Sequence, residues 1–473
     1  MSPDAVDYAG ASLWTLIGER LKRSPDASMI CDEYGRRLTF AEFALQAEQT
    51  AASLQLLGIA PGAVVAWQLT TRLESAVLLA ALSRLDVVQV PIVPLFRARE
   101  LRFIFEETRP DFTFTLGVLG QFDYTAMSRK VVAELGLSTR VLTLSDIPPV
   151  GDVAALPPEP QSGSAVRWIF STSGTSGKPK CVCHTDQTLM AAAELLGIGV
   201  NLTSRDTTTT NYPIAHCGGP VCVMGQMIFG NRTVYTEQFQ PEAAVALYRR
   251  EGVTVAGAGL PFYQAYLAEQ RKSPGVPVIP TLRALQGGGG PAPARIHHDI
   301  QRELGVPLLH VLGMTEALTL TRHPDSDIED RAHTVGVPGD GFQRGVPADR
   351  PRAHDVGLED DLMQRLVGHA VPIQRSPAGR NTRHYSAAAI PFVVLQELDQ
   401  FPAFGQRVLA AVVEADTPNR NDWFSAVPQV RPVLVVLANP HPIHQRFPVV
   451  DDVAHLTGLQ TRQVVHHGVG TAV

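Results

Sequence analysis

Residues 170–184 read FSTSGTSGKPKCVCH, a run of hydroxyl side chains, glycines and lysines that directly follows the apolar segment 166–169. Gly174 and Gly177 can adopt positive φ, which lets a ligand approach the main chain, and the hydroxyl groups around them can donate hydrogen bonds. The chain has only five lysines, and Lys178 and Lys180 are two of them. A loop entered from a buried strand can direct such groups toward one polyanion. The segment therefore predicts a phosphate-binding loop at the end of a strand.

Two other interpretations of this segment are less consistent with its residues. A solvent loop rich in Ser and Gly would explain the composition but not the paired lysines. A P-loop of the nucleoside triphosphatase kind needs Ser or Thr directly after its lysine to hold Mg²⁺, and Pro179 occupies that position.

Length and composition indicate a globular protein with more than one packed unit. The 473 residues exceed one ordinary core, and 45% hydrophobic with 18% charged residues is typical of folded chains. A net charge of −6 without a basic block argues against a nucleic-acid partner. Neither a membrane span nor a signal peptide is visible, and five cysteines suit a reducing cytoplasm. Zinc ligation by Cys181, Cys183, Cys217 and Cys222 is an alternative, although their spacing matches no common site.

The first 140 residues predict alternating helices and strands. Thr39 and Glu42 form a capping box that opens a helix through Leu57, and Gly58 closes it. Such alternation predicts an α/β fold with a parallel sheet covered by helices on both faces. The further elements expected here are strands at 64–69, 87–93 and 112–115 and helices at 74–85 and 99–107.

A second α/β series is expected after the phosphate loop. Residues 147–164 are rich in Pro, Gly and Ser and predict a surface connection between the two series. The expected helices cover 188–196, 220–229, 241–251, 261–271 and 294–304, and the expected strands cover 254–258, 282–286 and 307–311.

Three further segments carry side chains or glycines suited to ligand binding. The run 287–290 places four glycines before Pro291, between a strand and a helix, where backbone can lie flat against a planar ligand. The segment 313–316 reads GMTE, in which a threonine can donate to a phosphate and a glutamate supplies the hard oxygen that Mg²⁺ prefers. His216 is followed by Gly218 and Gly219 and is a candidate for the substrate pocket.

Together these segments resemble the adenylate-forming superfamily, which includes acyl-CoA synthetases. Residues 172–181 match its signature TSGTTGKPKG except where Ser176 and Cys181 differ, and the segments at His216, at 288–291 and at 313–316 match its further motifs. Leu312 replaces an aromatic residue that is usual in the family. The similarity covers Leu13 to Phe342 and implies the family's large N-terminal domain, with stacked helix-covered sheets.

The resemblance implies ATP, Mg²⁺ and coenzyme A as ligands together with a small-molecule carboxylic acid. In the family reaction the carboxylate attacks the α-phosphate of ATP to give acyl-AMP, and a thiol then takes the acyl group. The implied catalytic residues are Thr315, Glu316, Lys178 and His216, with Glu316 as the magnesium ligand. The implied nucleotide-binding residues are Thr172, Ser173, Gly174, Thr175, Ser176, Gly177, Lys178, Lys180, Gly288, Gly289, Gly290, Pro291, Gly313, Met314 and Thr315.

The resemblance ends near residue 343. The family pattern continues with a Thr-Gly-Asp segment, a hinge and a small domain bearing a lysine, but this chain has no Thr-Gly-Asp after residue 343 and no lysine after Lys272. The expected division is therefore a large domain at 1–343 and an unassigned segment at 344–473. That segment is either a different domain or an out-of-frame or disordered product of a coding sequence that lost its frame near Phe342.

Three functional hypotheses follow. The first is an acyl-CoA synthetase-like enzyme, impaired by its aberrant C-terminal part, that activates a fatty, alicyclic or aromatic acid. The second is a non-catalytic nucleotide- or partner-binding protein on the same fold, and the third is a product of an altered reading frame with no stable structure. A partly apolar substrate cavity is expected near Met224, residues 256–259 and Leu312.

Overall fold

A computed structural model describes residues 4–149, 151–172, 180–210, 212–319, 321–323 and 326–338 and two strands further along the chain. The chain divides into two compact units, at Met1–Ile390 and Pro391–Val473. The first unit contains all the predicted functional segments. In the second unit, β18 (Ala410–Ala415) pairs antiparallel with β19 (Val430–Val435). The predicted domain division at residue 343 stays a prediction.

One sheet of the first unit has six strands in the order β10-β9-β4-β3-β5-β8. All neighbours are parallel except β9 and β10, which form an antiparallel hairpin. Its strands are β3 (Val64–Gln68), β4 (Val88–Pro91), β5 (Phe112–Thr115), β8 (Arg140–Thr143), β9 (Val166–Thr172) and β10 (Lys180–Thr185).

The other large sheet has seven strands in the order β15-β14-β13-β11-β12-β1-β2. It is parallel except at its edge, where β2 runs antiparallel to β1. Its strands are β1 (Ser28–Asp32), β2 (Arg37–Thr39), β11 (Thr207–Thr210), β12 (Arg232–Tyr235), β13 (Val255–Ala258), β14 (Ala284–Gly287) and β15 (Leu308–His310). The expectation of parallel sheets is thus correct for their centres and wrong at one edge of each, where a short connection reverses the chain direction.

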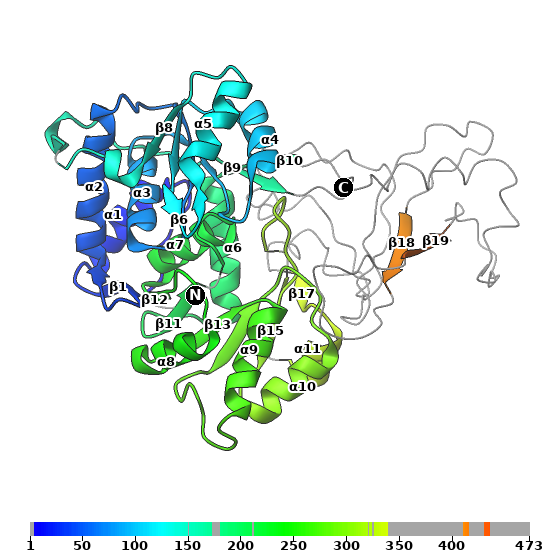
Figure 1. The fold of residues 1–473 in the computed structure, drawn as a ribbon. Helices are drawn as coiled ribbons and strands as arrows, with labels where there is room; N and C mark the ends of the chain where they lie inside the picture. Colours follow the sequence, from blue (N-terminus) through cyan, green and yellow to red (C-terminus); the bar gives the residue numbers. More distant parts are fainter. Residues whose placement is uncertain are drawn as a thin grey trace, which may run out of the picture. The chain divides into compact units, whose positions relative to one another are not determined.

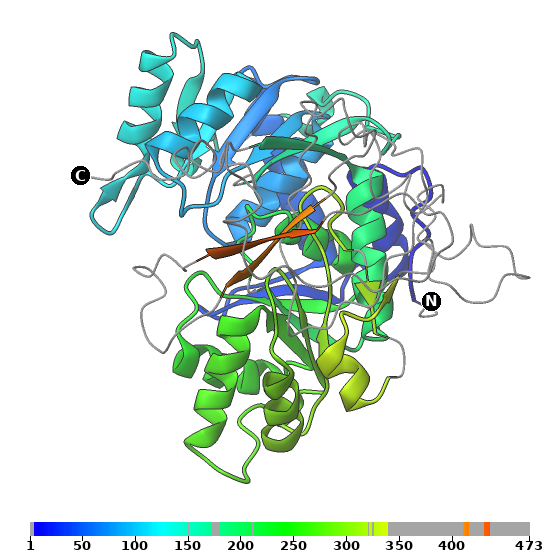
Figure 2. The same cartoon turned by 90° about the vertical axis from the view of Figure 1, so that its right-hand side faces the viewer.

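Helices lie between the sheets and on both outer faces, so this unit has five layers (Figure 1). The central layer contains α1 (Leu13–Arg23), α2 (Phe40–Leu56), α3 (Leu73–Arg84), α6 (Asp186–Gly199) and α7 (Gly218–Phe229). The helices α4 (Ala98–Thr108) and α5 (Tyr124–Glu134) cover the six-stranded sheet. The helices α8 (Pro241–Glu251), α9 (Leu260–Arg271) and α10 (Ala294–Glu303) cover the seven-stranded sheet, at the opposite end of the unit (Figure 2).

Strand side chains alternate between the central core and the outer cores. Val65 and Trp67 of β3 enter the central cluster, whereas Ala66 between them joins the outer cluster with α4 and α5. This period of two is what a sheet covered on both faces requires. The confirmed fold class is therefore an α/β large domain with stacked helix-covered sheets.

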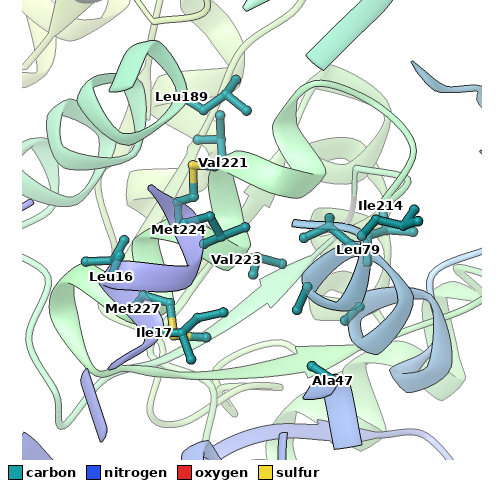
Figure 3. Close-up of a cluster of buried hydrophobic side chains, with 14 of the residues drawn as sticks. Leu16, Ile17, Ala47, Leu79, Leu189, Ile214, Val221, Val223, Met224 and Met227 are labelled. Carbon is teal, nitrogen blue, oxygen red and sulfur yellow. The ribbon is translucent and has the colours of Figure 1, made fainter. Parts of the chain in front are cut away.

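The central core joins the amino-terminal helix to the helix that follows His216. Figure 3 shows Leu16 and Ile17 of α1 beside Met224 and Met227 of α7, and all four side chains are buried. Each Å² of apolar area removed from water contributes about 25 to 30 cal/mol, so these buried contacts stabilise the packing of α7 against α1. The sequence predicted that Met224 lines the substrate cavity. The structure shows that this prediction is wrong, because Met224 belongs to the central core and does not line the cavity.

Most predicted helices are present with small differences at their ends. The capping box of α2 is present, because Thr39 Oγ1 accepts a hydrogen bond from Glu42 N–H and the Glu42 carboxylate accepts one from Thr39 N–H. Sequence reasoning missed the helices α1 and α5 and the strands β1, β2, β8, β10, β11 and β12. The remaining short elements are β6 (Val118–Leu119), β7 (Phe122–Asp123), β16 (Thr321–Arg322), β17 (Val337–Pro338), α11 (Ile328–His333) and two 3₁₀ turns at Leu144–Asp146 and Val153–Ala155.

Candidate functional site

A cavity of about 370 Å³ lies where the carboxyl ends of β11, β13 and β14 meet α6 and α7. This edge of a parallel sheet is the usual position of ligand sites in α/β proteins. The cavity brings together residues from three predicted segments, which begin at residues 216, 288 and 313. The predicted site residues that line it are His216, Gly288, Gly289, Gly313, Met314 and Thr315.

Tyr212 holds the glycine turn in place and was not among the predicted site residues. Its hydroxyl donates to the carbonyl of Ala258, 2.7 Å away, and accepts a hydrogen bond from Gly288 N–H at 3.0 Å. Burial raises the pKa of this hydroxyl to about 12, so it stays protonated near neutral pH. The sequence signal that could have found Tyr212 is its position directly after β11, at the ligand-facing end of a strand.

The glycine run contains two kinds of position. A Cβ on Gly287 would lie 1.8 Å from the Ala258 carbonyl oxygen, and one on Gly288 would lie 2.3 Å from that of Val311. Close backbone packing therefore requires these two glycines. Added Cβ atoms on Gly289 and Gly290 meet nothing within 4 Å, and Gly289 has φ +93°. Open space beside this part of the turn fits a planar ligand.

His216 lies at the cavity and stacks on Tyr212, with ring centroids 5.6 Å apart and an interplanar angle of 16°. Gly218 N–H donates to His216 Nδ1 at 3.1 Å, so the neutral imidazole carries its proton on Nε2. Desolvation by the surrounding protein lowers the pKa of His216. The ring is therefore neutral at pH 7 and can donate one hydrogen bond from Nε2.

The turn that contains Thr315 and Glu316 is joined to the β9–β10 hairpin. His184 on β10 donates from Nε2 to the Thr315 carbonyl, 2.6 Å away, and its Nδ1 lies 3.0 Å from Thr188 Oγ1. Burial lowers the pKa of His184, which keeps the ring neutral. This partly buried contact joins the hairpin that carries the predicted phosphate loop to the turn that carries the predicted magnesium ligand.

The predicted phosphate loop is only partly within the described residues. Thr172 pairs with Lys180 across the hairpin, so the two ends of the loop are adjacent. The hydroxyl of Thr172 is buried and has no hydrogen-bond partner among the described residues, which fits a site completed by a ligand. Ser173, Gly174, Thr175, Ser176, Gly177 and Lys178 lie outside the described residues.

Five predicted residues within the described part of the chain do not line the cavity: Thr172, Lys180, Gly290, Pro291 and Glu316. Gly290 instead offers its carbonyl to His310 Nε2 at 2.7 Å. Glu316 is partly buried in the turn after Thr315, one residue beyond the cavity lining.

The cysteines of the zinc alternative are all free thiols. Among residues 4–338, in the parts that the structure describes, no group of three or more His, Cys, Asp or Glu is arranged to hold a metal ion. Cys217 and Cys222 line the cavity, and burial raises the pKa values of these thiols to about 11 and about 12. Within the described part of the chain, no helix has the length and hydropathy of a membrane span.

Comparisons with known proteins agree with this geometry. The AMP-binding enzyme family matches residues 17–345. The chain is 30% identical over 351 residues to the salicyl-AMP ligase / salicyl-S-ArCP synthetase of Mycobacterium tuberculosis, covering 70% of this chain and 61% of that protein. The chain therefore spans about three fifths of the length of that curated relative.

Two solved structures share the fold. A long-chain-fatty-acid-CoA ligase from Archaeoglobus fulgidus superposes with a TM-score of 0.62 at 20% identity, covering 72% of this chain and 71% of that one. The O-succinylbenzoate coenzyme A synthetase of Bacillus subtilis, solved with ATP and magnesium ion, gives 0.60 at 20% identity, covering 69% and 65%. The cavity, its glycine turn and the family match together place this chain in the AMP-binding enzyme family, within the adenylate-forming superfamily.

Proposed function

We propose that this protein binds ATP and a carboxylic acid and forms an acyl-adenylate. The observation that carries the proposal is the single cavity lined by His216, Gly288 and Thr315, beside a hairpin tied to the Thr315 turn through His184. In such a site catalysis comes mainly from positioning the two reactants and neutralising charge.

The proposed roles follow the chemistry of each group. Ser173, Gly174, Thr175, Ser176, Gly177 and Lys178 would hold the terminal phosphates, and Thr172 and Lys180 would support the two ends of that loop. Glu316 would hold Mg²⁺, whose charge neutralises the phosphates when it is bound. Gly288 to Pro291, with Gly313 and Met314, would border the adenine.

The acid would lie near His216. Its neutral ring has a proton on Nε2 that can be donated to a carboxylate oxygen without placing a full charge in the cavity. Thr315 would donate its hydroxyl to a phosphate oxygen. These groups orient the carboxylate toward the α-phosphate, and displacement there would release pyrophosphate.

Transfer of the acyl group to coenzyme A is the proposed second step, and it should be the more impaired one. The chain has no Thr-Gly-Asp after residue 343 and no lysine after Lys272, so it lacks both the Thr-Gly-Asp segment and the small-domain lysine that the resemblance implies. The loss of one preorganised group commonly costs about 10²- to 10³-fold in rate. The proposed site of action is the cytoplasm.

Pyrophosphate exchange into ATP with a panel of carboxylic acids tests this function, alongside calorimetry with ATP and Mg²⁺. We expect ATP binding and slow, acid-dependent exchange. Glu316→Gln should lower exchange by about 10²-fold or more, by loss of one preorganised charged group. Glu329→Gln is the matched control, because its carboxylate is a surface group with 65% side-chain exposure.

A second function is favoured by the missing lysine: nucleotide or partner binding without catalysis. ATP binding with no exchange for any acid would support this alternative and contradict acyl-adenylate formation. Absence of ATP binding would contradict both acyl-adenylate formation and nucleotide binding, and would leave partner binding as the function. Fast exchange and full thioester formation would refute the proposed impairment. Translation of the neighbouring reading frames checks whether a Thr-Gly-Asp and a carboxy-terminal lysine are encoded there.

A further inference from the structure

One face of each of two helices lines the cavity over the seven-stranded sheet. The lining residues on these faces include Gly218, Val221 and Gly225 of α7 and Ala193, Leu196 and Val200 at α6 and its C-cap. Both sets recur at intervals of three and four residues, which is the spacing of one helix face. Each face extends for about 10 Å at about 1.5 Å per residue.

The helices α6 and α7 run parallel where they meet beside the cavity. A Cβ built on Gly225 would lie 4.0 Å from that of Ala193. Four residues further along each helix, a Cβ built on Gly197 would lie 2.1 Å from the ring of Phe229. The level of Gly225 on α7 is therefore the level of Ala193 on α6.

The cavity has a near end at His216 and a far end at Val200. Gly218 N–H donates to His216 Nδ1, so the lining face of α7 begins at the near end and reaches Gly225 two turns later. Beyond that level α6 continues the wall to Val200. Val200 and Val255 line the far end and are only 3% and 5% exposed, so protein encloses that end.

Gly225 leaves the passage open midway along the cavity. The 4.0 Å between its added Cβ and that of Ala193 is an ordinary van der Waals distance, so packing against the described residues does not require glycine there. Gly197 differs, because no Cβ fits 2.1 Å from the Phe229 ring. Glycine is less favourable than alanine inside a helix, so Gly225 weakens α7 without improving its packing. What the missing side chain provides is space in the cavity.

The lining offers no opposite charge to a ligand beyond its carboxylate. No Lys, Arg, Asp or Glu is among the described residues that line the cavity, and His216 is neutral. Arg283 donates to the Val200 carbonyl at 2.7 Å, but it is already paired with Asp206 at 2.7 Å. A buried charge without a partner is costly, so a second charged group on the acid would be rejected.

We propose that the acid substrate carries a single carboxylate and an extended, uncharged apolar chain, and that Gly225 is the specificity-determining residue that admits this chain to the far end of the cavity. This inference rests on the proposed function, since it assumes that the carboxylate lies near His216. The substrate class is therefore the linear medium-chain monocarboxylic acids, with dicarboxylic acids of the same length excluded.

A series of linear acids tests the proposal with the full-length chain. Calorimetry with α,β-methylene-ATP and Mg²⁺ measures acid affinity without turnover, because the bond that adenylation breaks cannot be cleaved in this analogue. From butanoate through hexanoate and octanoate to decanoate, we expect binding to tighten by about fourfold for each added CH₂. Decanedioate has the length of decanoate and a second carboxylate, and it should bind at least about a hundredfold more weakly than decanoate.

Substitutions at Gly225 should shorten the accepted chain. Gly225→Leu should leave butanoate affinity unchanged and weaken decanoate by about fourfold for each methylene that it excludes from the cavity. Gly225→Ala adds only the Cβ that the structure accommodates, so it should raise the urea midpoint of unfolding and still weaken decanoate more than butanoate.

Gly18→Ala is the matched control for these variants. Gly18 lies within α1, its added Cβ would meet nothing within 4 Å, and it does not line the cavity. This variant should also raise the urea midpoint, with no change in affinity for any acid.

The outcomes distinguish this inference from the proposed function. Affinity that is independent of chain length, equal binding of decanedioate and decanoate, or equal weakening of all acids in the Gly225 variants overturns the inference. Pyrophosphate exchange under any of these results leaves acyl-adenylate formation standing alone. Affinity that depends on chain length and on Gly225 supports the inference even where exchange is absent. No binding of any acid overturns both.

Discussion

Tyr212→Phe removes one hydroxyl from the base of the candidate nucleotide site and retains the ring that stacks on His216. Gly288 N–H would lose its acceptor at 3.0 Å, and the Ala258 carbonyl would lose its donor at 2.7 Å. The two losses are not equal. Tyr263 also points its hydroxyl at the Ala258 carbonyl, 3.3 Å away, so this oxygen keeps a partner. Gly288 N–H is the group left unpaired.

The expected cost follows from that single group. An unpaired buried backbone N–H costs about 1 to 3 kcal/mol, so we expect the free energy of unfolding to fall by about 2 kcal/mol. ATP affinity should fall as well, because Gly288 belongs to the turn proposed to border the adenine. Urea unfolding followed by tryptophan fluorescence measures the first effect, with an unchanged dependence on urea as the sign that only stability has altered. Calorimetry measures the second.

Tyr263→Phe is the matched control for this change. The substitution is the same and the acceptor is shared, but only the 3.3 Å contact with Ala258 is lost while Tyr212 keeps its own at 2.7 Å. We expect a loss below about 1 kcal/mol and no change in ATP affinity. Equal and small losses in the two variants would refute the reasoning, because they would mean that Gly288 N–H does not depend on Tyr212.

Two further predictions concern stability. Thr39→Ala removes the acceptor for Glu42 N–H at the start of α2 and should lower the free energy of unfolding by about 1 kcal/mol. Thr39→Ser keeps a hydroxyl acceptor and should retain most of that stability. Urea unfolding of both variants tests this prediction. Burial lowers the pKa of His297 to about 3, so below the ordinary imidazole value of about 6.5 the unfolded chain binds a proton that the folded chain excludes. The free energy of unfolding should therefore fall as the pH drops below about 6.5, by about 1 kcal/mol at about pH 5.5. His297→Leu should reduce this dependence of the free energy of unfolding on pH. An equal pH dependence in the unaltered protein and in His297→Leu would contradict the assignment to His297.

The sequence alone was sufficient for features that depend on neighbouring residues. The capping box of Thr39 and Glu42 was recognised because both partners lie within one helical turn. The alternation of strands and helices was recognised from short apolar periods, and the glycine turn and the GMTE segment from their positions directly after strands. These local patterns were enough for the fold class, the family resemblance and six residues that line the cavity.

Tertiary structure decided the features that join distant parts of the chain. The place of β1 beside β12 depends on pairing across about 200 residues, and the link between His184 and Thr315 spans 131 positions. The cavity itself forms only because α6 and α7 pack over the sheet, and the contacts that bury its residues are not encoded by local periodicity.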